Sequence, residues 1–352
     1  MSWDIWTRDL WALPFATMEA WRRALELPLE PHREGPHWST PARLVLEVGL
    51  LRLWDFSRDG GDAAPLVILS PYALHDAQLA DLAPGHSLVG ALLARGCTRL
   101  YVVEWASATA QTQLYGIDNL LAELNVAIDE IGAPADLIGL CQGGWLSLLY
   151  AARFPKKTRR MVIVGAPIDM RAEPSVLSEP VDRTSDFALD RLIGAGGGIV
   201  RGAHMAPLWP REDCAEQRIV DALQIAPPFD SATVAAFQAW DRRLLDLPGP
   251  YYREVIQYLY RDNLLAAGGF RALGRPVDLR ALDHPLFLLA GSQDGVTPPA
   301  QLLALKDIVR RDVETAVAGC GHLALFMGRR TLENEWRRIA QWISGQEADG
   351  GR

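Results

Sequence analysis

The chain has 352 residues, of which 49% are apolar and 22% are charged, and its formal net charge is −8. Its size and composition are typical of a globular protein with one large α/β domain and an insertion. The acidic balance argues against nucleic acid as a partner, because a phosphate backbone requires a basic surface. The four cysteines (Cys97, Cys141, Cys214 and Cys320) form no C-x-x-C pair and no zinc-ligand spacing, so we expect free thiols in a reducing compartment.

The N-terminal residues show no secretory pattern, because they lack a basic stretch followed by an apolar one and carry Asp4 and Asp9. No apolar run approaches the roughly 20 residues of a membrane-spanning helix. We therefore expect a cytoplasmic protein with no transmembrane segment.

Residues 1–40 have a helical pattern that is rich in tryptophan, with Trp3, Trp6, Trp11 and Trp21. Two interpretations stay open for this N-terminal helical segment. It could dock on the main domain through its aromatic face, or it could lie as an amphipathic element on an apolar surface.

From residue 42 onward, apolar runs typical of strands alternate with helical segments. The expected strands cover residues 42–53, 66–69, 100–105, 135–140, 161–164, 285–290 and, more weakly, 313–317; the expected helices cover 87–95, 117–131, 145–154 and 331–343. Continuous apolar strands that alternate with helices favour a mostly parallel, doubly wound sheet covered on both faces.

The rhythm of strands and helices is interrupted between residues 170 and 280. This stretch contains a glycine-rich patch at 194–198, several prolines and helical pieces, but no clear strand. We interpret it as a helical cap inserted into a core formed by residues 41–169 and 281–345. The last residues, 346–352, are expected to form a disordered tail.

A nucleophile elbow is the most specific motif in the chain. The run Gly139-Leu140-Cys141-Gln142-Gly143 has the G-x-nucleophile-x-G spacing, with cysteine where serine is usual. An apolar strand precedes it and a helix follows it, which is the context that the motif requires. A thiol at this turn ionises near neutral pH and attacks soft acyl groups such as thioesters.

An acid and a base occupy the positions that this type of fold reserves for them. Asp294 follows the apolar run 285–290, and His322 follows the weak last strand. The order Cys141, Asp294, His322 is that of an α/β-hydrolase triad. Taken alone, an aspartate in such a loop is usually a turn former, but here three residues fill three expected places. We therefore predict that these residues are catalytic.

Backbone N–H groups of Gln142 and of a residue near Tyr72 are the expected donors of an oxyanion hole, on position alone. His75, Asp76 and His86, which also follow the strand at 66–69, are weaker candidates for a role in the site. His284 and Cys320 are expected to be structural.

Beyond the elbow, the sequence resembles polyhydroxyalkanoate synthases, especially the short two-subunit type. The resemblance covers roughly residues 65 to 345. It includes the elbow, Ala166-Pro167-Ile168-Asp169, the run 259–264 (Leu-Tyr-Arg-Asp-Asn-Leu), the run 274–279 (Gly-Arg-Pro-Val-Asp-Leu) and Gly321-His322.

The resemblance implies an α/β-hydrolase fold and an acyltransferase that takes 3-hydroxyacyl-CoA thioesters. Cys141 would carry the acyl group, His322 would act as its base, and Asp294 would orient His322 or help to activate the monomer hydroxyl. The CoA thioester is a substrate, and no cofactor or metal is expected. The resemblance also implies a polyester granule surface and a partner subunit or second copy as further partners.

The sequence departs from the family pattern at three places near the expected acyl pocket. Residues 74–78 (Leu-His-Asp-Ala-Gln) are extra, Trp145 replaces a small residue, and the usual glycine two places after His322 is absent. Two alternatives therefore stay open beside the synthase. One is a cysteine hydrolase, such as an intracellular polyhydroxyalkanoate depolymerase or a thioesterase; the other is a non-catalytic relative that binds granules or a subunit.

Overall fold

The structure is a computed structural model that describes residues 35–58, 63–178, 181, 184–206 and 215–345. Most of the N-terminal segment predicted over residues 1–40, and the tail at 346–352, lie outside the described residues.

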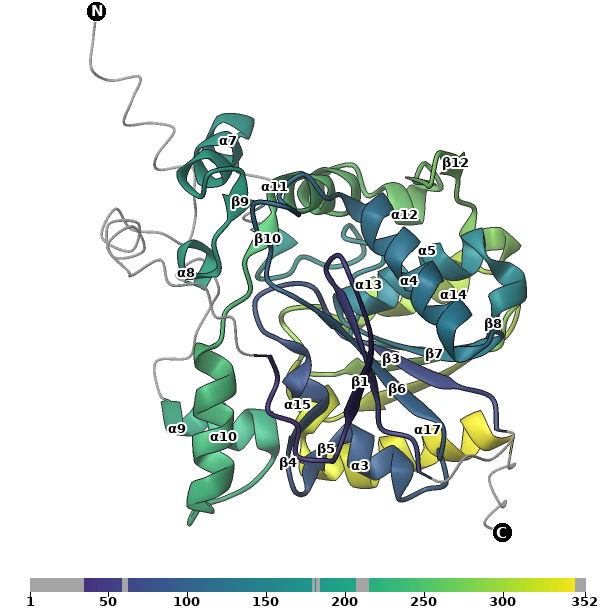
Figure 1. Ribbon diagram of the computed structural model, residues 1–352. Coiled ribbons are helices and arrows are strands. Elements are labelled where there is room, and N and C mark those ends of the chain that lie inside the picture. The colour runs from purple at the N-terminus through teal and green to yellow at the C-terminus, as the bar shows by residue number, and fades with distance from the viewer. Residues whose placement is uncertain (1–34, 59–62, 179–180, 182–183, 207–214, 346–352) are drawn as a thin grey trace, which may run out of the picture.

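A mostly parallel eight-stranded sheet forms the centre of the molecule, with the order β1-β2-β6-β3-β7-β8-β13-β14 (Figure 1). Its strands are β1 (Arg43–Val48), β2 (Leu51–Asp55), β3 (Leu66–Leu69), β6 (Leu100–Trp105), β7 (Ala135–Leu140), β8 (Thr158–Val164), β13 (Leu286–Gly291) and β14 (Val313–Ala318). β1 pairs antiparallel with β2 and β2 with β6, whereas the other neighbours pair in parallel. The predicted fold class is therefore confirmed.

One predicted strand proved to be two. Residues 42–53 fold into the β1–β2 hairpin, which reverses at Gly49 and Leu50. Gly49 has a φ of +56°, a conformation that glycine adopts without steric cost. The apolar pattern continues across this turn because Leu50 is buried, and for that reason the pattern alone did not reveal the reversal.

Helices cover both faces of the sheet. One face carries α4 (Ile117–Ile131), α5 (Gln142–Arg153), α13 (Pro299–Leu303) and α14 (Leu305–Ile308); the other carries α3 (Leu88–Leu93), α15 (Ala324–Met327), α16 (Arg329–Glu333) and α17 (Glu335–Ser344). Strand β3 shows why both faces are apolar: Val67 and Leu69 join the first core, whereas Leu66 and Ile68 join the second. The closing helix predicted over 331–343 is divided into α16 and α17 at Asn334.

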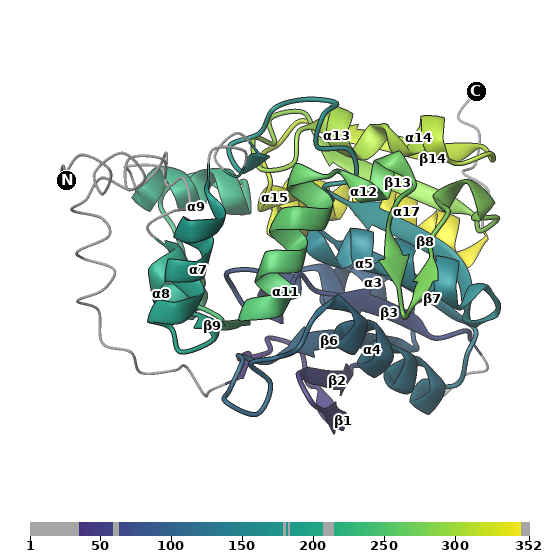
Figure 2. The ribbon, with the colours of Figure 1, turned by 90° about the horizontal axis from the view of Figure 1, so that it is seen from above.

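Mainly short elements connect β8 to β13. They are α7 (Asp186–Ala195), β9 (Ile199–Val200), α8 (Gly202–Met205), α9 (Ala215–Leu223), α10 (Ser231–Arg242), β10 (Leu247–Pro248), α11 (Gly249–Glu254), the π-helix η4 (Val255–Arg261), α12 (Leu264–Ala267), β11 (Arg271–Ala272), β12 (Arg275–Pro276) and η5 (Leu279–Ala281). Figure 2 shows α7 to α9 to one side of the sheet. The pairs β9–β10 and β11–β12 are only two residues long per strand, too short to leave an alternating pattern. The assignment of residues 170–280 as a cap stays a prediction.

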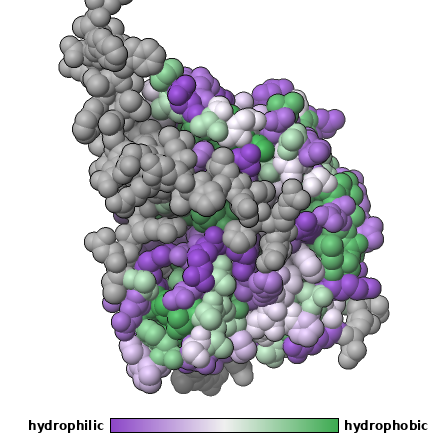
Figure 3. All heavy atoms as spheres, turned by 60° about the vertical axis from the view of Figure 1, so that its left-hand side comes forward, coloured by the Kyte–Doolittle hydropathy of each residue, from purple (hydrophilic) through white to green (hydrophobic). Residues whose placement is uncertain are grey.

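A smaller connection follows β3. It consists of η1 (Ala77–Ala80), β4 (Asp81–Ala83) and β5 (His86–Ser87), while the turn η2 (Pro155–Lys157) joins α5 to β8. In the described part of the chain, no helix is both long and apolar enough to cross a membrane. On the face shown in Figure 3, hydrophilic residues are mixed with small groups of hydrophobic residues.

Candidate active site

Cys141 lies at the turn between β7 and α5 in a strained backbone conformation, with φ +50° and ψ −115°. Positive φ is unusual for a residue with a side chain, and such outliers gather at functional sites. The turn is held by two backbone hydrogen bonds: Cys141 N–H donates to the Val164 carbonyl at 2.8 Å, and Gly144 N–H donates to the Cys141 carbonyl at 2.9 Å. Cys141 as a whole residue is 7% exposed.

The glycines on either side of Cys141 allow three elements to approach closely. A Cβ on Gly139 would lie 2.5 Å from the Gly143 carbonyl oxygen, and a Cβ on Gly143 would lie 2.1 Å from the Leu69 carbonyl oxygen. These are backbone atoms and cannot move aside. The contact of β7 and β3 with the start of α5 therefore requires both glycines, which explains the spacing of the motif.

Asp294 follows β13 and is fully engaged in hydrogen bonds. Its Oδ1 accepts from the N–H groups of Val296 and Thr297, each at 2.9 Å. Its Oδ2 accepts from the Thr297 hydroxyl at 2.9 Å and faces His322 Nδ1 at 2.7 Å. The carboxylate is buried, so these donors replace the water that a buried charge would otherwise lack.

His322 follows β14, and its ring lies edge-on to Phe326 with centroids 5.1 Å apart. Burial alone acts to lower the pKa of His322, but the charges of Asp294 and Cys141 outweigh it and raise that pKa above its ordinary value. The shift requires Cys141 to lie near the imidazole. The structure thus brings the three predicted residues to one place, and their catalytic roles stay a prediction.

Thr297 is a member of this cluster that the sequence did not single out. Its hydroxyl lies 2.9 Å from Asp294 Oδ2, 2.9 Å from the Gly165 carbonyl and 3.3 Å from His322 Nδ1. Thr297 thereby joins Gly165, in the loop after β8, to Asp294. An aspartate side chain commonly bonds the backbone a few residues after it. The three-residue spacing between Asp294 and Thr297 was therefore the signal in the sequence that could have identified Thr297.

The two residues expected to form the oxyanion hole lie beside the elbow. Gln142 is the first residue of α5, where a backbone N–H has no partner within the helix. Tyr72 is buried, and its hydroxyl donates to the carbonyl of Ala106 at 3.0 Å, with the Asp246 carbonyl 3.3 Å away. The oxyanion role of both N–H groups stays a prediction.

A cavity of about 410 Å³ reaches His322 from outside. Its lining combines the apolar side chains of Leu74, Val176, Val296 and Leu323 with the polar ones of His75, Arg218, Asp221 and Gln293. A ligand in this cavity would therefore meet both kinds of side chain beside the imidazole.

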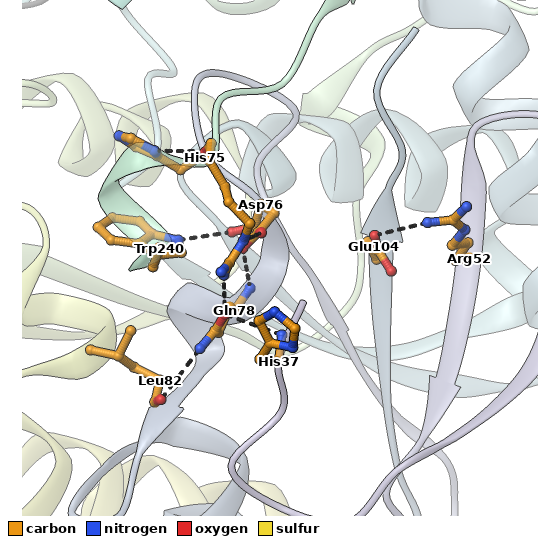
Figure 4. Close-up of polar contacts among 9 residues, drawn as sticks. His37, Arg52, His75, Asp76, Gln78, Leu82, Glu104 and Trp240 are labelled. Carbon is orange, nitrogen blue, oxygen red and sulfur yellow. Dashed lines mark hydrogen bonds and ion pairs between the residues drawn. The ribbon is translucent and has the colours of Figure 1, made fainter. Parts of the chain in front are cut away.

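The extra residues 74–78 attach the loop after β3 to α10 and the segment that follows it. Figure 4 shows Asp76, Gln78 and Trp240 gathered there, together with His75. The Asp76 carboxylate accepts from Arg243 Nε at 2.6 Å, and both side chains are buried. The Asp76 carbonyl accepts from the indole N–H of Trp240 at 3.3 Å. Asp76 therefore holds the loop after β3 against Trp240 and Arg243.

The other weak candidates also make structural contacts. The His75 ring packs on Trp240 with centroids 4.5 Å apart. His86 Nδ1 lies 2.9 Å from the Met327 carbonyl, and His284 Nε2 lies 2.9 Å from the Pro155 carbonyl. Cys320 is buried, and burial raises the pKa of its thiol to about 11, so it is a poor nucleophile at neutral pH.

Trp145, the bulky residue after the two glycines, is fully buried in the core on the α5 face of the sheet. Among the residues that the structure describes, no group of three or more histidine, cysteine or carboxylate side chains could hold a metal ion.

Comparison with known proteins gives one match to a family and several to individual proteins. Residues 104–328 match the family described as alpha/beta hydrolase fold. The chain is 27% identical to the poly(3-hydroxyalkanoate) polymerase subunit PhaC of Synechocystis sp., over 88% of this chain and 85% of the relative. It is 26% identical to the subunit of the same name from Allochromatium vinosum, over 87% of this chain and 88% of the relative.

Solved structures share the fold at lower identity. A membrane phospholipase A matches with a TM-score of 0.54 and 14% identity, covering 88% of each chain. A putative lipase from Acinetobacter baumannii matches with a TM-score of 0.53 and 15% identity, covering 88% of this chain and 93% of the other. The chain belongs to the α/β-hydrolase fold family, and it is similar in sequence to poly(3-hydroxyalkanoate) polymerase subunits.

Proposed function

We propose that this protein is an acyltransferase of the polyhydroxyalkanoate synthase type, which loads 3-hydroxyacyl groups from CoA thioesters onto Cys141 and adds them to a polyester chain. One observation carries the proposal: a cysteine at the elbow, beside the buried Asp294–His322 pair with its 2.7 Å contact. The similarity to polymerase subunits over most of the chain supports the same assignment.

The first half-reaction is acyl loading. The Cys141 thiolate attacks the carbonyl carbon of the CoA thioester, and the N–H groups of Gln142 and Tyr72 stabilise the developing oxyanion. The bond between the acyl carbon and the CoA sulfur then breaks, and the CoA thiolate takes a proton from the protonated His322. Asp294 holds the Nδ1–H side of the imidazole, so that Nε2 is left to serve the reacting atoms.

The second half-reaction is transfer. A hydroxyl group attacks the acyl carbon on Cys141, gives its proton to His322, and forms an ester while the Cys141 thiolate leaves. Exclusion of water from the acylated Cys141 is what would separate this transfer from hydrolysis. On this proposal the protein acts without a cofactor in the cytoplasm, with 3-hydroxyacyl-CoA, a granule surface and a partner subunit or second copy as its partners.

The test of the nucleophile is Cys141→Ala, assayed with radiolabelled 3-hydroxybutyryl-CoA. We expect the wild-type chain to carry covalent label and the variant to carry none, since alanine offers no sulfur, while both show the same circular dichroism spectrum. The matched control is Cys320→Ala, which removes a buried thiol close to His322 and should keep the label. Full labelling of Cys141→Ala would overturn the assignment.

The fate of the acyl group separates transfer from hydrolysis. With 3-hydroxybutyryl-CoA we expect released CoA to be accompanied by polymer that sediments with the protein. If free 3-hydroxybutyrate is the sole acyl product, the protein is a cysteine hydrolase. If wild-type protein releases no CoA, with its expected partner subunit added, the proposed activity is wrong.

A further inference from the structure

Tyr251, on α11, connects the two segments expected to form the oxyanion hole. Its hydroxyl lies 2.9 Å from the Tyr72 carbonyl oxygen and 2.8 Å from Gln142 Oε1. The two phenol rings pack with centroids 5.0 Å apart, and the Tyr251 side chain is 2% exposed. A single side chain from the segment between β8 and β13 therefore touches both the loop after β3 and the start of α5.

The hydroxyl is a hydrogen-bond donor in this place. Burial, followed by the charge of Cys141, raises the pKa of Tyr251 well above its ordinary value, so the phenol stays protonated. It has one proton, which it can give to one oxygen at a time. With the amide of Gln142 rotated by 180°, Nε2 would donate to the phenol oxygen while the phenol donates to Tyr72. The Gln142 amide, the Tyr251 hydroxyl and the Tyr72 carbonyl would then each have a hydrogen-bond partner.

The helix that carries Tyr251 is itself fixed to the sheet domain. Tyr251 N–H donates to the Tyr115 carbonyl at 3.0 Å. One turn further along the helix, the Glu254 carboxylate accepts from Ile117 N–H at 2.7 Å, at the start of α4. Two anchors on one short helix hold the phenol in place before any substrate arrives, which is what a preorganised site requires.

We propose that Tyr251 is a positioning residue for the oxyanion hole. By holding the Tyr72 carbonyl, it fixes the residue whose own N–H is expected to face the substrate. By holding the Gln142 side chain, it keeps that amide away from the space in front of the Gln142 N–H. The inference rests on the proposed function only in requiring that Cys141 becomes acylated; Tyr251 itself forms no bond to the acyl group.

The role of Tyr251 predicts a particular kinetic signature. Removing a direct oxyanion donor costs about 100- to 1,000-fold in kcat. Removing a neutral hydrogen bond that only positions such donors should cost less, about 10-fold. The loss should fall on kcat and leave KM close to its wild-type value, because the N–H groups that the phenol positions act where charge develops in the transition state. The intrinsic reactivity of the thiol should not change, because Asp294 and His322 are untouched.

The experiment compares Tyr251→Phe with Tyr252→Phe, a matched loss of a hydroxyl one residue along α11. No hydrogen bond involves the Tyr252 hydroxyl in the part of the chain that the structure describes. Acylation of Cys141 is followed as the burst of p-nitrophenol from p-nitrophenyl acetate, and thiol reactivity as the rate of inactivation by iodoacetamide. Neither reagent depends on CoA or on polymer formation.

We expect Tyr251→Phe to slow the burst about 10-fold and to be alkylated at the wild-type rate, and we expect Tyr252→Phe to match wild type in both. In a double-mutant cycle, Gln142→Met should cost less in Tyr251→Phe than in the wild-type chain, because the two side chains act together. Equal bursts in the two phenylalanine variants would overturn the inference. A parallel loss of alkylation in Tyr251→Phe would also overturn it, by showing a role at the thiol or in folding. A wild-type burst without CoA release from 3-hydroxybutyryl-CoA would overturn the proposed function and leave the comparison of variants valid.

Discussion

At the residue scale, the interaction of Cys141 with His322 determines what the site can do. The raised pKa of His322 means that the imidazole is protonated over the neutral range, next to the sulfur. A cation beside a thiol favours the thiolate, which is the form that attacks acyl carbon. The imidazolium can also give its proton to the leaving CoA thiolate, as the proposed loading step requires.

This pairing predicts that His322 controls the alkylation of Cys141. We expect iodoacetamide to label Cys141 about 10-fold faster in wild-type protein than in His322→Gln at pH 7, because an imidazolium favours the attacking form of a neighbouring sulfur and glutamine carries no charge. The measurement is the rate of iodoacetamide labelling at Cys141, quantified by mass spectrometry of the peptide.

Glutamine is the chosen replacement because it is polar and cannot be protonated. Cys97 is an internal control, because burial raises the pKa of its thiol to about 11 and it should remain almost unlabelled. Equal labelling rates in the wild-type and His322→Gln proteins would show that His322 does not act on the Cys141 sulfur.

At the element scale, a buried ion pair holds the segment after α10 against the loop after β3. Asp76 and Arg243 have side-chain exposures of only 5% and 6% and meet at 2.6 Å. The attachment is extended by main-chain contacts, since Leu245 N–H donates to the Leu74 carbonyl at 2.9 Å. A pair of this kind fixes which elements meet, whatever its net contribution to stability.

Arg243→Met should lower the free energy of unfolding by about 3–5 kcal/mol, because it leaves the Asp76 carboxylate buried without its partner. The double variant Asp76→Asn, Arg243→Met should recover part of that loss, since no charge is left unpaired. The exposed pair Arg311–Asp283 is the matched control, and Arg311→Met should cost at most about 1 kcal/mol. Urea unfolding measures all three. An equal cost for the two arginine variants would contradict the prediction.

Asp169 and Asn263 belong to two separate runs that resemble polyhydroxyalkanoate synthases, and the fold brings them together. Asn263 adopts a left-handed conformation with φ +50° at the start of α12. Its Oδ1 accepts from Met170 N–H at 3.1 Å, and its Nδ2 donates to Asp169 Oδ1 at 2.8 Å. Both residues tie the loop after β8 to the far end of the segment between β8 and β13. Their role in the fold is therefore structural.

At the scale of the whole molecule, one buried carboxyl makes stability depend on pH. Glu123 on α4 is 7% exposed, and its carboxylate accepts from Leu50 N–H at 3.1 Å in the β1–β2 turn. Burial raises the pKa of Glu123 from 4.5 to about 7. The folded chain therefore binds more protons than the unfolded chain between these pH values, and the free energy of unfolding falls as pH rises through this window.

Glu123→Gln should remove this fall, because the amide cannot ionise. Relative to wild type, the variant should gain about 1–2 kcal/mol between pH 5 and pH 8, less than the full shift implies because part of the fall lies below pH 5. The measurement is urea unfolding of both proteins at the two pH values. A constant difference between them would show that Glu123 does not titrate in the folded state.

Much of the fold could be predicted from the sequence because parallel strands buried on two sides leave continuous apolar runs. The limits of β6 and α4 agree with the predicted ranges 100–105 and 117–131. The prediction was wrong for the β1–β2 hairpin, where a buried leucine at the turn concealed the reversal. The two-residue strands β9 to β12 could not be found, since no pattern exists at that length.

The site was open to prediction only in part. Cys141, Asp294 and His322 lie directly after strands, where the chain order reveals them. Thr297 had only its three-residue spacing from Asp294 as a signal. Tyr251 lies 179 residues from Tyr72, whose carbonyl it contacts, and such a contact depends on tertiary packing, which leaves no local signature.

The backbone at Cys141 also bears on how such a chain would evolve. A φ of +50° with ψ at −115° is a conformation that glycine adopts freely and that costs a residue with a side chain about 1–3 kcal/mol. The residue that makes the fold most stable at this position is therefore one that abolishes the proposed chemistry. If selection for catalysis were relaxed, glycine at position 141 would be favoured by stability alone. A residue with a side chain at this turn therefore costs stability, as expected where the side chain serves a function.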